Sequence, residues 1–222
     1  MPDILIDSLL RDPLDLPVFW SFRRCPYAMR ARLALQVSNQ RVDLREIVLR
    51  DKPLAFLKTS PSATVPCLDT GSQVIDESLD IMRWALAHDD PQSWLDMPET
   101  GYQLIQQSDG PFKSALDRYK YATRFPEHDA LAERDRASAF VQDLETNLAG
   151  SQALFGRDKT LADMAILPFI RQFAHVDLEW FQAQSWPNVI AWLEEFKTSE
   201  LFGAIMKKYP IWTPQADLVS FP

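Results

Sequence analysis

Hydrophobic positions in the first 88 residues alternate between the spacing of strands and the spacing of helices. Short apolar runs at 16–22 and 42–48 are typical of strands, and residues 26–38 between them carry the broad apolar surface of a helix. This order predicts a β-α-β unit, whose two strands are parallel and joined by a right-handed crossover.

The pattern then turns to a hairpin and a further helix. Residues 53–58 predict a short helical turn. Apolar runs at 65–69 and 73–76 flank Thr70-Gly71-Ser72, which is a hairpin signal. Residues 77–88 place their apolar side chains on one side of a helix. The segment therefore predicts a small α/β domain.

The pattern after a polar break at 89–98 is helical throughout. Apolar residues recur at helical spacing through 112–119, 137–148 and 189–196, and no strand alternation is visible beyond residue 100. We therefore expect an N-terminal extension at 1–15, an α/β domain at 16–88, a linker at 89–98 and an all-helical domain at 99–222. Thr160 and Asp163 are spaced as a capping box before a very apolar helix, so we expect Asp163 to stabilise the fold.

Composition and charge narrow the function classes. The net charge of −8 lies entirely in residues 89–222, because residues 1–88 hold 11 basic and 11 acidic side chains. An acidic second half argues against nucleic acid or an anionic membrane as a partner. The histidines, His88, His128 and His175, lack metal-site spacing, so no metal is expected. The acidic N-terminus and the two cysteines suggest a cytoplasmic protein with reduced thiols.

The residue that carries the most chemistry is Cys25, which follows the first strand and precedes Pro26 and the first helix. A helix N-terminus offers unpaired backbone N–H groups and a partial positive charge, which favour the reactive thiolate. Arg23, Arg24 and Arg30 add positive charge close by in sequence. Cys67, inside a predicted central strand, is expected to be a core residue.

The order of strand, Cys-Pro, helix, strand and then Val-Pro before a hairpin is that of a thioredoxin-like fold. Over residues 16–210 the chain resembles the cytosolic glutathione S-transferase superfamily, in particular its cysteine-type members, the omega-class and glutaredoxin-2-like proteins. The resemblance rests on several motifs at family spacing, which are Cys25-Pro26-Tyr27, Lys52-Pro53, Ser60-Pro61, Val65-Pro66, Glu77-Ser78 and Thr160–Asp163.

The resemblance implies a role for each matched residue. Cys25 is the expected nucleophile in glutathione-dependent thiol transfer. The expected glutathione-binding residues are Lys52 for the glycyl carboxylate, Val65 and a cis Pro66 for the cysteinyl backbone, and Glu77 and Ser78 for the γ-glutamyl group. Glutathione is then the co-substrate, and a small electrophile or a mixed disulfide is the second partner. Family members form dimers or monomers, so a homodimer is possible.

Several alternatives stay open from the sequence. Ser21 and Tyr27 are rival nucleophiles in principle, because other transferase classes use serine or tyrosine. Position 28 is Ala, so Cys25 lacks a Cys-x-x-Cys partner and only a monothiol cycle is available. The chain could also conjugate glutathione to an apolar electrophile, or act as a non-catalytic binding protein on the same fold.

Overall fold

A computed structural model describes residues 16–222, so the predicted extension at 1–15 lies outside the described residues. The chain forms two compact units. The sheet domain, as far as it is described, comprises residues 16–91 and 204–222, and the helical domain comprises residues 92–203. The expected combination of a thioredoxin-like sheet followed by a helical domain is confirmed.

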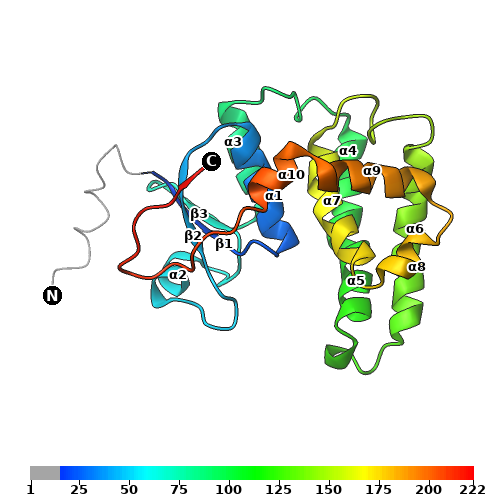
Figure 1. The fold of residues 1–222 in the computed structure, drawn as a ribbon, viewed down its shortest axis with the longest axis horizontal. Coiled ribbons are helices and arrows are strands. Elements are labelled where there is room, and N and C mark those ends of the chain that lie inside the picture. The colour runs from blue at the N-terminus through cyan, green and yellow to red at the C-terminus, as the bar shows by residue number, and fades with distance from the viewer. Residues whose placement is uncertain (1–15) are drawn as a thin grey trace. The chain divides into compact units, whose positions relative to one another are not determined.

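The sheet domain follows the predicted order of elements (Figure 1). Strands β1 and β2 are parallel and joined through α1, which confirms the β-α-β unit, and β3 and β4 form the predicted antiparallel hairpin. Helix α1 packs against α3. The elements are β1 (Val18–Ser21), α1 (Pro26–Val37), β2 (Val42–Glu46), α2 (Leu54–Thr59), β3 (Cys67–Asp69), β4 (Val74–Ile75) and α3 (Ser78–His88).

Successive residues of β1 point to opposite faces of the sheet. On one face, Val18 and Trp20 pack with Phe56 of α2 and with Cys67 of β3, all of them buried. On the other face, Ser21 is buried and receives a hydrogen bond from α1. The expectation that Cys67 is a core residue is therefore confirmed, because its side chain is wholly inaccessible.

The last 19 residues differ from the sequence expectation, which assigned them to the helical domain. They belong to the sheet domain and end in β5 (Ser220–Phe221), which pairs antiparallel with β2 and gives the strand order β4-β3-β1-β2-β5. The ring of Trp212 packs on Trp20 with centroids 4.9 Å apart. The two ladder pairs with β5 cover backbone groups of β2 that an open sheet edge would expose, and the Trp212 contact packs the tail against Trp20 of β1.

The helical domain is built from consecutive helices, as the sequence predicts, and α7 is almost wholly buried. Helices α4 and α5 run on through a π-helical turn, η1, that contains Pro111, a residue without an N–H for a regular helix. The helices are α4 (Glu99–Gln107), η1 (Ser108–Phe112), α5 (Lys113–Lys120), η2 (Ala122–Arg124), α6 (Ala130–Asn147), α7 (Leu161–Ala174), α8 (Leu178–Gln182), α9 (Pro187–Thr198) and α10 (Glu200–Ile205).

The expected capping box begins α7. One carboxylate oxygen of Asp163 accepts hydrogen bonds from the Thr160 backbone N–H at 2.9 Å and from the Thr160 hydroxyl at 3.0 Å. The other oxygen accepts the Leu154 N–H at 3.0 Å and the indole N–H of Trp192 at 3.1 Å. Asp163 therefore joins the start of α7 to a preceding loop and to α9.

Candidate functional site

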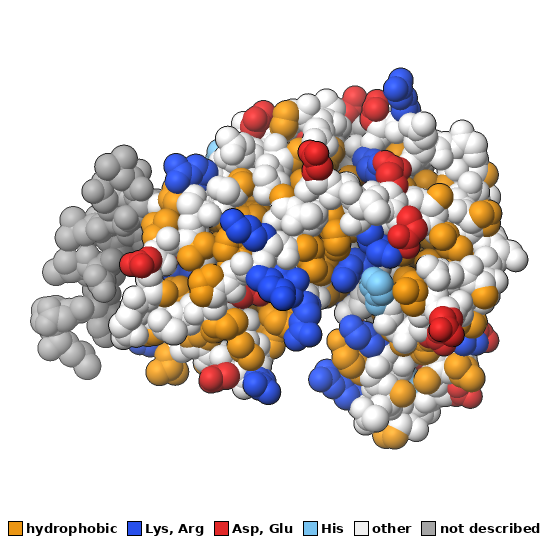
Figure 2. All heavy atoms as spheres, viewed as in Figure 1, with side chains coloured by type: hydrophobic (Ala, Val, Ile, Leu, Met, Phe, Trp, Pro, Cys, Tyr) orange, Lys and Arg blue, Asp and Glu red, His pale blue; other side chains and the backbone are white. Residues whose placement is uncertain are grey.

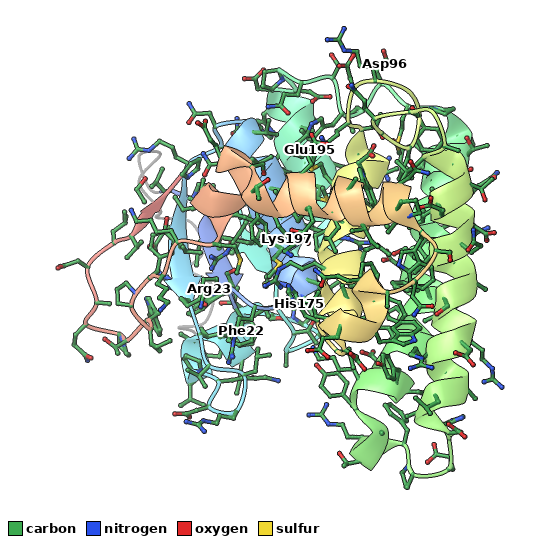
Figure 3. All side chains as sticks on the ribbon, turned by 45° about the vertical axis from the view of Figure 1, so that its right-hand side comes forward. Phe22, Arg23, Asp96, His175, Glu195 and Lys197 are labelled. Atoms are coloured by element: carbon green, nitrogen blue, oxygen red, sulfur yellow. The ribbon has the colours of Figure 1, made fainter. Side chains whose placement is uncertain are left out.

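Cys25 is the N-cap of α1, with extended backbone angles (φ −77°, ψ 124°) and Pro26 in the first helical position. Its N–H donates to the Phe22 carbonyl at 2.9 Å, which closes the turn between β1 and α1. Figure 3 labels Phe22 and Arg23 on this turn. No side chain caps the start of α1. The thiol is therefore held beside backbone N–H groups that favour a negative charge.

Val65 lies directly against this thiol, 40 residues further along the chain. The Cys25 Sγ is 3.7 Å from the Val65 carbonyl oxygen and donates a hydrogen bond to it. The Val65–Pro66 peptide bond is cis, as the resemblance implies. Within residues 16–222, the Val65 N–H donates no hydrogen bond, so it is available to a ligand.

The other three residues expected to bind glutathione lie on two further segments. Glu77 is the exposed N-cap of α3, and Ser78 is buried in its first helical position. No side chain caps this helix either, so its first N–H groups are free to meet an anion. Lys52 is half-buried in the connection from β2 to α2 and forms no ion pair with a described residue.

A buried ion pair that the sequence did not predict stabilises the turn between β1 and α1, which holds Cys25. Arg32 of α1 pairs with Glu46 at the end of β2, and both side chains are buried. The other Glu46 oxygen accepts the Arg23 backbone N–H at 2.6 Å, two residues before Cys25. Arg32 also donates to the hydroxyl of Ser21 at 2.9 Å and to the carbonyl of Ile205 at 3.0 Å. The pair thus joins β1, α1, β2 and the C-terminal tail.

The rival nucleophiles and the nearby arginines have structural contacts of their own. Ser21 is wholly buried beneath Arg32, which leaves it inaccessible to a substrate. The Arg30 guanidinium lies over the ring of Tyr27, and Arg24 lies over the ring of Phe22. The guanidinium of Arg23 donates to the Met206 carbonyl at 3.4 Å. Cys25 remains the accessible sulfur of the site.

Cys67 differs from Cys25 in both exposure and chemistry. Burial raises the pKa of the Cys67 thiol to about 11, against the opposing effect of a hydrogen bond with Ser60. At pH 7 a thiol with that pKa is thiolate in only about one molecule in ten thousand. Cys25, by contrast, is partly exposed.

This contrast predicts the outcome of thiol labelling. Treating the native protein with iodoacetamide at pH 7 should alkylate Cys25 rapidly and leave Cys67 unmodified, because the thiolate is the reactive form. Peptide mass spectrometry after timed quenching measures both rates, and unfolding in urea should make both sites reactive. Equal labelling of the two cysteines in the native protein would contradict the prediction.

Within residues 16–222, no group of three or more His, Cys, Asp or Glu side chains is placed to hold a metal ion. In the same range, no helix combines the length and the apolar character needed to cross a bilayer.

Comparison by sequence gives one family model and several relatives. Residues 19–94 match the model described as the glutathione S-transferase N-terminal domain. The chain is 28% identical over 188 residues to Protein IN2-1 of Zea mays, an alignment that covers 81% of this chain and 75% of that protein. It is 24% identical over 205 residues to Elongation factor 1-gamma 3 of Oryza sativa subsp. japonica, covering 82% of this chain but only 49% of that protein.

Comparison by structure gives the fold over most of the chain. A glutathione transferase family member from Pseudomonas fluorescens, solved with two glutathione bound, matches with a TM-score of 0.75 at 15% identity, covering 86% of this chain and 92% of that one. Poplar glutathione transferase F1 matches with a TM-score of 0.72 at 18% identity, covering 86% and 96%. These structural matches show that most of the chain has the fold of glutathione transferases, and residues 19–94 match the model of the N-terminal domain of glutathione S-transferases.

Proposed function

We propose that the chain is a glutathione-dependent thiol transferase of the cysteine type, with Cys25 as its monothiol nucleophile. The observation that carries this proposal is the position of the Cys25 thiol. It lies at an uncapped helix start and 3.7 Å from the backbone of Val65, which precedes a cis proline. The helix start favours the thiolate, and the neighbouring Val65 backbone offers a surface along which a disulfide can approach.

The reaction takes two thiol–disulfide exchanges. In the first, the Cys25 thiolate attacks the glutathione sulfur of a mixed disulfide, forms a Cys25–glutathione disulfide and releases the other half as a thiolate, which takes up a proton. In the second, the thiolate of a free glutathione attacks the same glutathione sulfur, forms oxidised glutathione and returns Cys25 to thiolate. Ala28 and the buried Cys67 offer no resolving thiol, so glutathione completes the cycle.

The residues expected to bind glutathione suit its chemical groups. The free N–H of Val65 can hold the cysteinyl backbone of glutathione. The uncapped start of α3 can hold the γ-glutamyl carboxylate, with the Ser78 hydroxyl as a further donor and Glu77 as partner of the ammonium group. Lys52 is the proposed partner of the glycyl carboxylate. A cytoplasmic location, where thiols stay reduced, suits this chemistry.

The direct test measures two activities of the wild-type protein, disulfide reduction and conjugation, together with its binding of glutathione. We expect catalysed reduction of the mixed disulfide between glutathione and 2-mercaptoethanol, with a rate that saturates in glutathione. Oxidised glutathione is followed through its reduction by glutathione reductase and NADPH. Turnover of an apolar electrophile alone would instead favour conjugation. Glutathione binding by calorimetry without either activity would favour a binding protein.

Glu77 provides a prediction about the glutathione site. Glu77→Gln removes the charge that is proposed to meet the glutathione ammonium, so calorimetry should show affinity weaker by about tenfold, as is typical for an exposed charge-assisted contact. The matched control is Asp80→Asn, which removes an acidic charge from the first turn of the same helix. An equal loss in both variants would show a general field effect and would refute a specific contact by Glu77.

A further inference from the structure

A cavity of about 610 Å³ in the sheet domain lies beside the nucleophile turn. Residues from three segments line it: the segment 22–24 before Cys25, the segment 46–50 that begins with the last residue of β2, and the segment 208–211 of the C-terminal tail; within these segments, Ile47 and Pro210 do not line the cavity. Its volume is in the range of sites that bind small molecules. None of the residues expected to bind glutathione lines it, so its chemistry is a separate question.

The lining is strongly basic although the whole chain carries a net charge of −8. Four cationic side chains line the cavity, and within residues 16–222 no carboxylate forms an ion pair with any of them. They are Arg23, Arg24, Arg50 and Lys208. The acidic residue of the lining, Glu46, is already neutralised by Arg32 and accepts the Arg23 backbone N–H. In a space-filling view, Lys and Arg side chains gather among hydrophobic ones on this domain (Figure 2).

The cavity also offers apolar surface to a ligand. Leu49 and Ile211 line it and are 41% and 51% exposed, which is high for aliphatic side chains. A cluster of unpaired cations with apolar neighbours suits an organic anion, because both the charges and the carbon skeleton then find partners.

The cavity lining and the nucleophile are neighbours along the chain. Arg24 immediately precedes Cys25, and the Phe22 carbonyl accepts the Cys25 N–H at 2.9 Å. Phe22 lines the cavity and also packs, like Cys25, on the core cluster around Trp20. A molecule seated in the cavity is therefore close to the turn that holds the sulfur.

We infer that this cavity selects the second substrate of the thiol-transfer reaction, by binding the carboxylates of the half that leaves as a thiol. The inference rests on the proposed function. The substrate class is then a mixed disulfide of glutathione with a carboxylate-rich small thiol, held by Arg50 and Lys208 while Cys25 attacks the glutathione sulfur.

The test measures charge preference with three mixed disulfides of glutathione, formed with mercaptosuccinate, 2-mercaptoethanol and cysteamine. We expect kcat/KM to fall in that order for the wild type, and the preference to shrink as salt rises. In the double variant Arg50→Gln with Lys208→Gln, the ratio of kcat/KM for the mercaptosuccinate over the 2-mercaptoethanol disulfide should fall about tenfold, as two exposed ion pairs allow. The control Lys58→Gln removes an exposed charge of α2 outside the cavity and should keep the ratio.

The outcomes separate this inference from the proposed function. Equal activity of the wild type on the three disulfides overturns the inference. A double variant that changes only the KM for glutathione also overturns it, because the cavity would then be part of the glutathione site. If the wild type turns over none of them, the proposed function fails and binding decides the inference. Calorimetry of the mercaptosuccinate disulfide with Cys25→Ser should then show salt-sensitive binding that the double variant loses, and absence of binding overturns the inference.

Discussion

Replacing Cys25 with serine should reduce mixed-disulfide reduction to the uncatalysed rate. The reason is chemical, because a hydroxyl group cannot form the sulfur–sulfur bond on which the proposed first exchange depends, and it is not ionised at neutral pH. The fold should be unaffected, since Cys25 is a partly exposed N-cap without a side-chain capping bond and serine is favoured at that position. The measurement is the coupled glutathione reductase assay, together with thermal unfolding of both proteins.

The matched control is Cys67→Ala, which removes the other sulfur of the chain. Cys67 is buried and its pKa is about 11, so the folded control should retain activity while losing some stability from the core. Mass spectrometry should also trap a glutathione adduct on Cys25 in the wild type at low glutathione. Full disulfide reduction by Cys25→Ser would place the nucleophile elsewhere. If Cys25→Ser lost disulfide reduction but still conjugated glutathione to electrophiles, the two reactions would depend on different groups of the protein.

The local pattern was sufficient for most elements of the sheet domain. The runs at 16–22 and 42–48 gave parallel strands because a helix of the right length lies between them, and Thr70-Gly71-Ser72 marked the hairpin. The position of Cys25 at a helix start followed from Pro26, which suits the first helical position. These are local signals, in which neighbouring residues carry the structural preference.

Contacts between distant segments could not be predicted in this way. Arg32 lies within an apolar helix and Glu46 at the end of an alternating strand, and neither pattern says that the two form a buried pair. The tail at 204–222 adds β5 to β2 across about 180 positions of sequence, with a strand of only two residues. A strand so short has no periodicity of its own, so its partner decides its conformation.

The same limit applies to the site. The sequence indicated which residues match glutathione-binding motifs, and the structure brings Cys25 and Val65 into contact. The cationic cavity was not visible in the sequence, because Arg50 and Lys208 are separated by more than 150 positions and each resembles an ordinary solvated charge. Arg23 and Arg24, by contrast, stand out in the sequence only through their closeness to Cys25. Their contacts with Met206 and Phe22 depend on the fold.

Asp163 shows how much of the helical domain depends on one buried carboxylate. Burial raises the pKa of Asp163, and the hydrogen bonds from Thr160, Leu154 and Trp192 act in the opposite direction. Two of the four donors are backbone N–H groups, and the residues that supply the four donors are all buried. Such donors have no access to water, so each one left without its acceptor carries a desolvation cost.

Asp163→Ala should therefore lower the free energy of unfolding by about 3–5 kcal/mol, because it leaves four buried donors unsatisfied at once. Urea unfolding measures the loss. Calorimetry with glutathione should show that the folded variant keeps its affinity, since within residues 16–222 the hydrogen bonds of Asp163 all come from residues of the helical domain. The control Asp158→Ala makes the same substitution at an exposed position five residues earlier and should change stability by no more than about 0.5 kcal/mol. If Asp163→Ala kept full stability but lost thiol transfer, Asp163 would act in the reaction, and the division between a sheet domain for chemistry and a helical domain for support would be wrong.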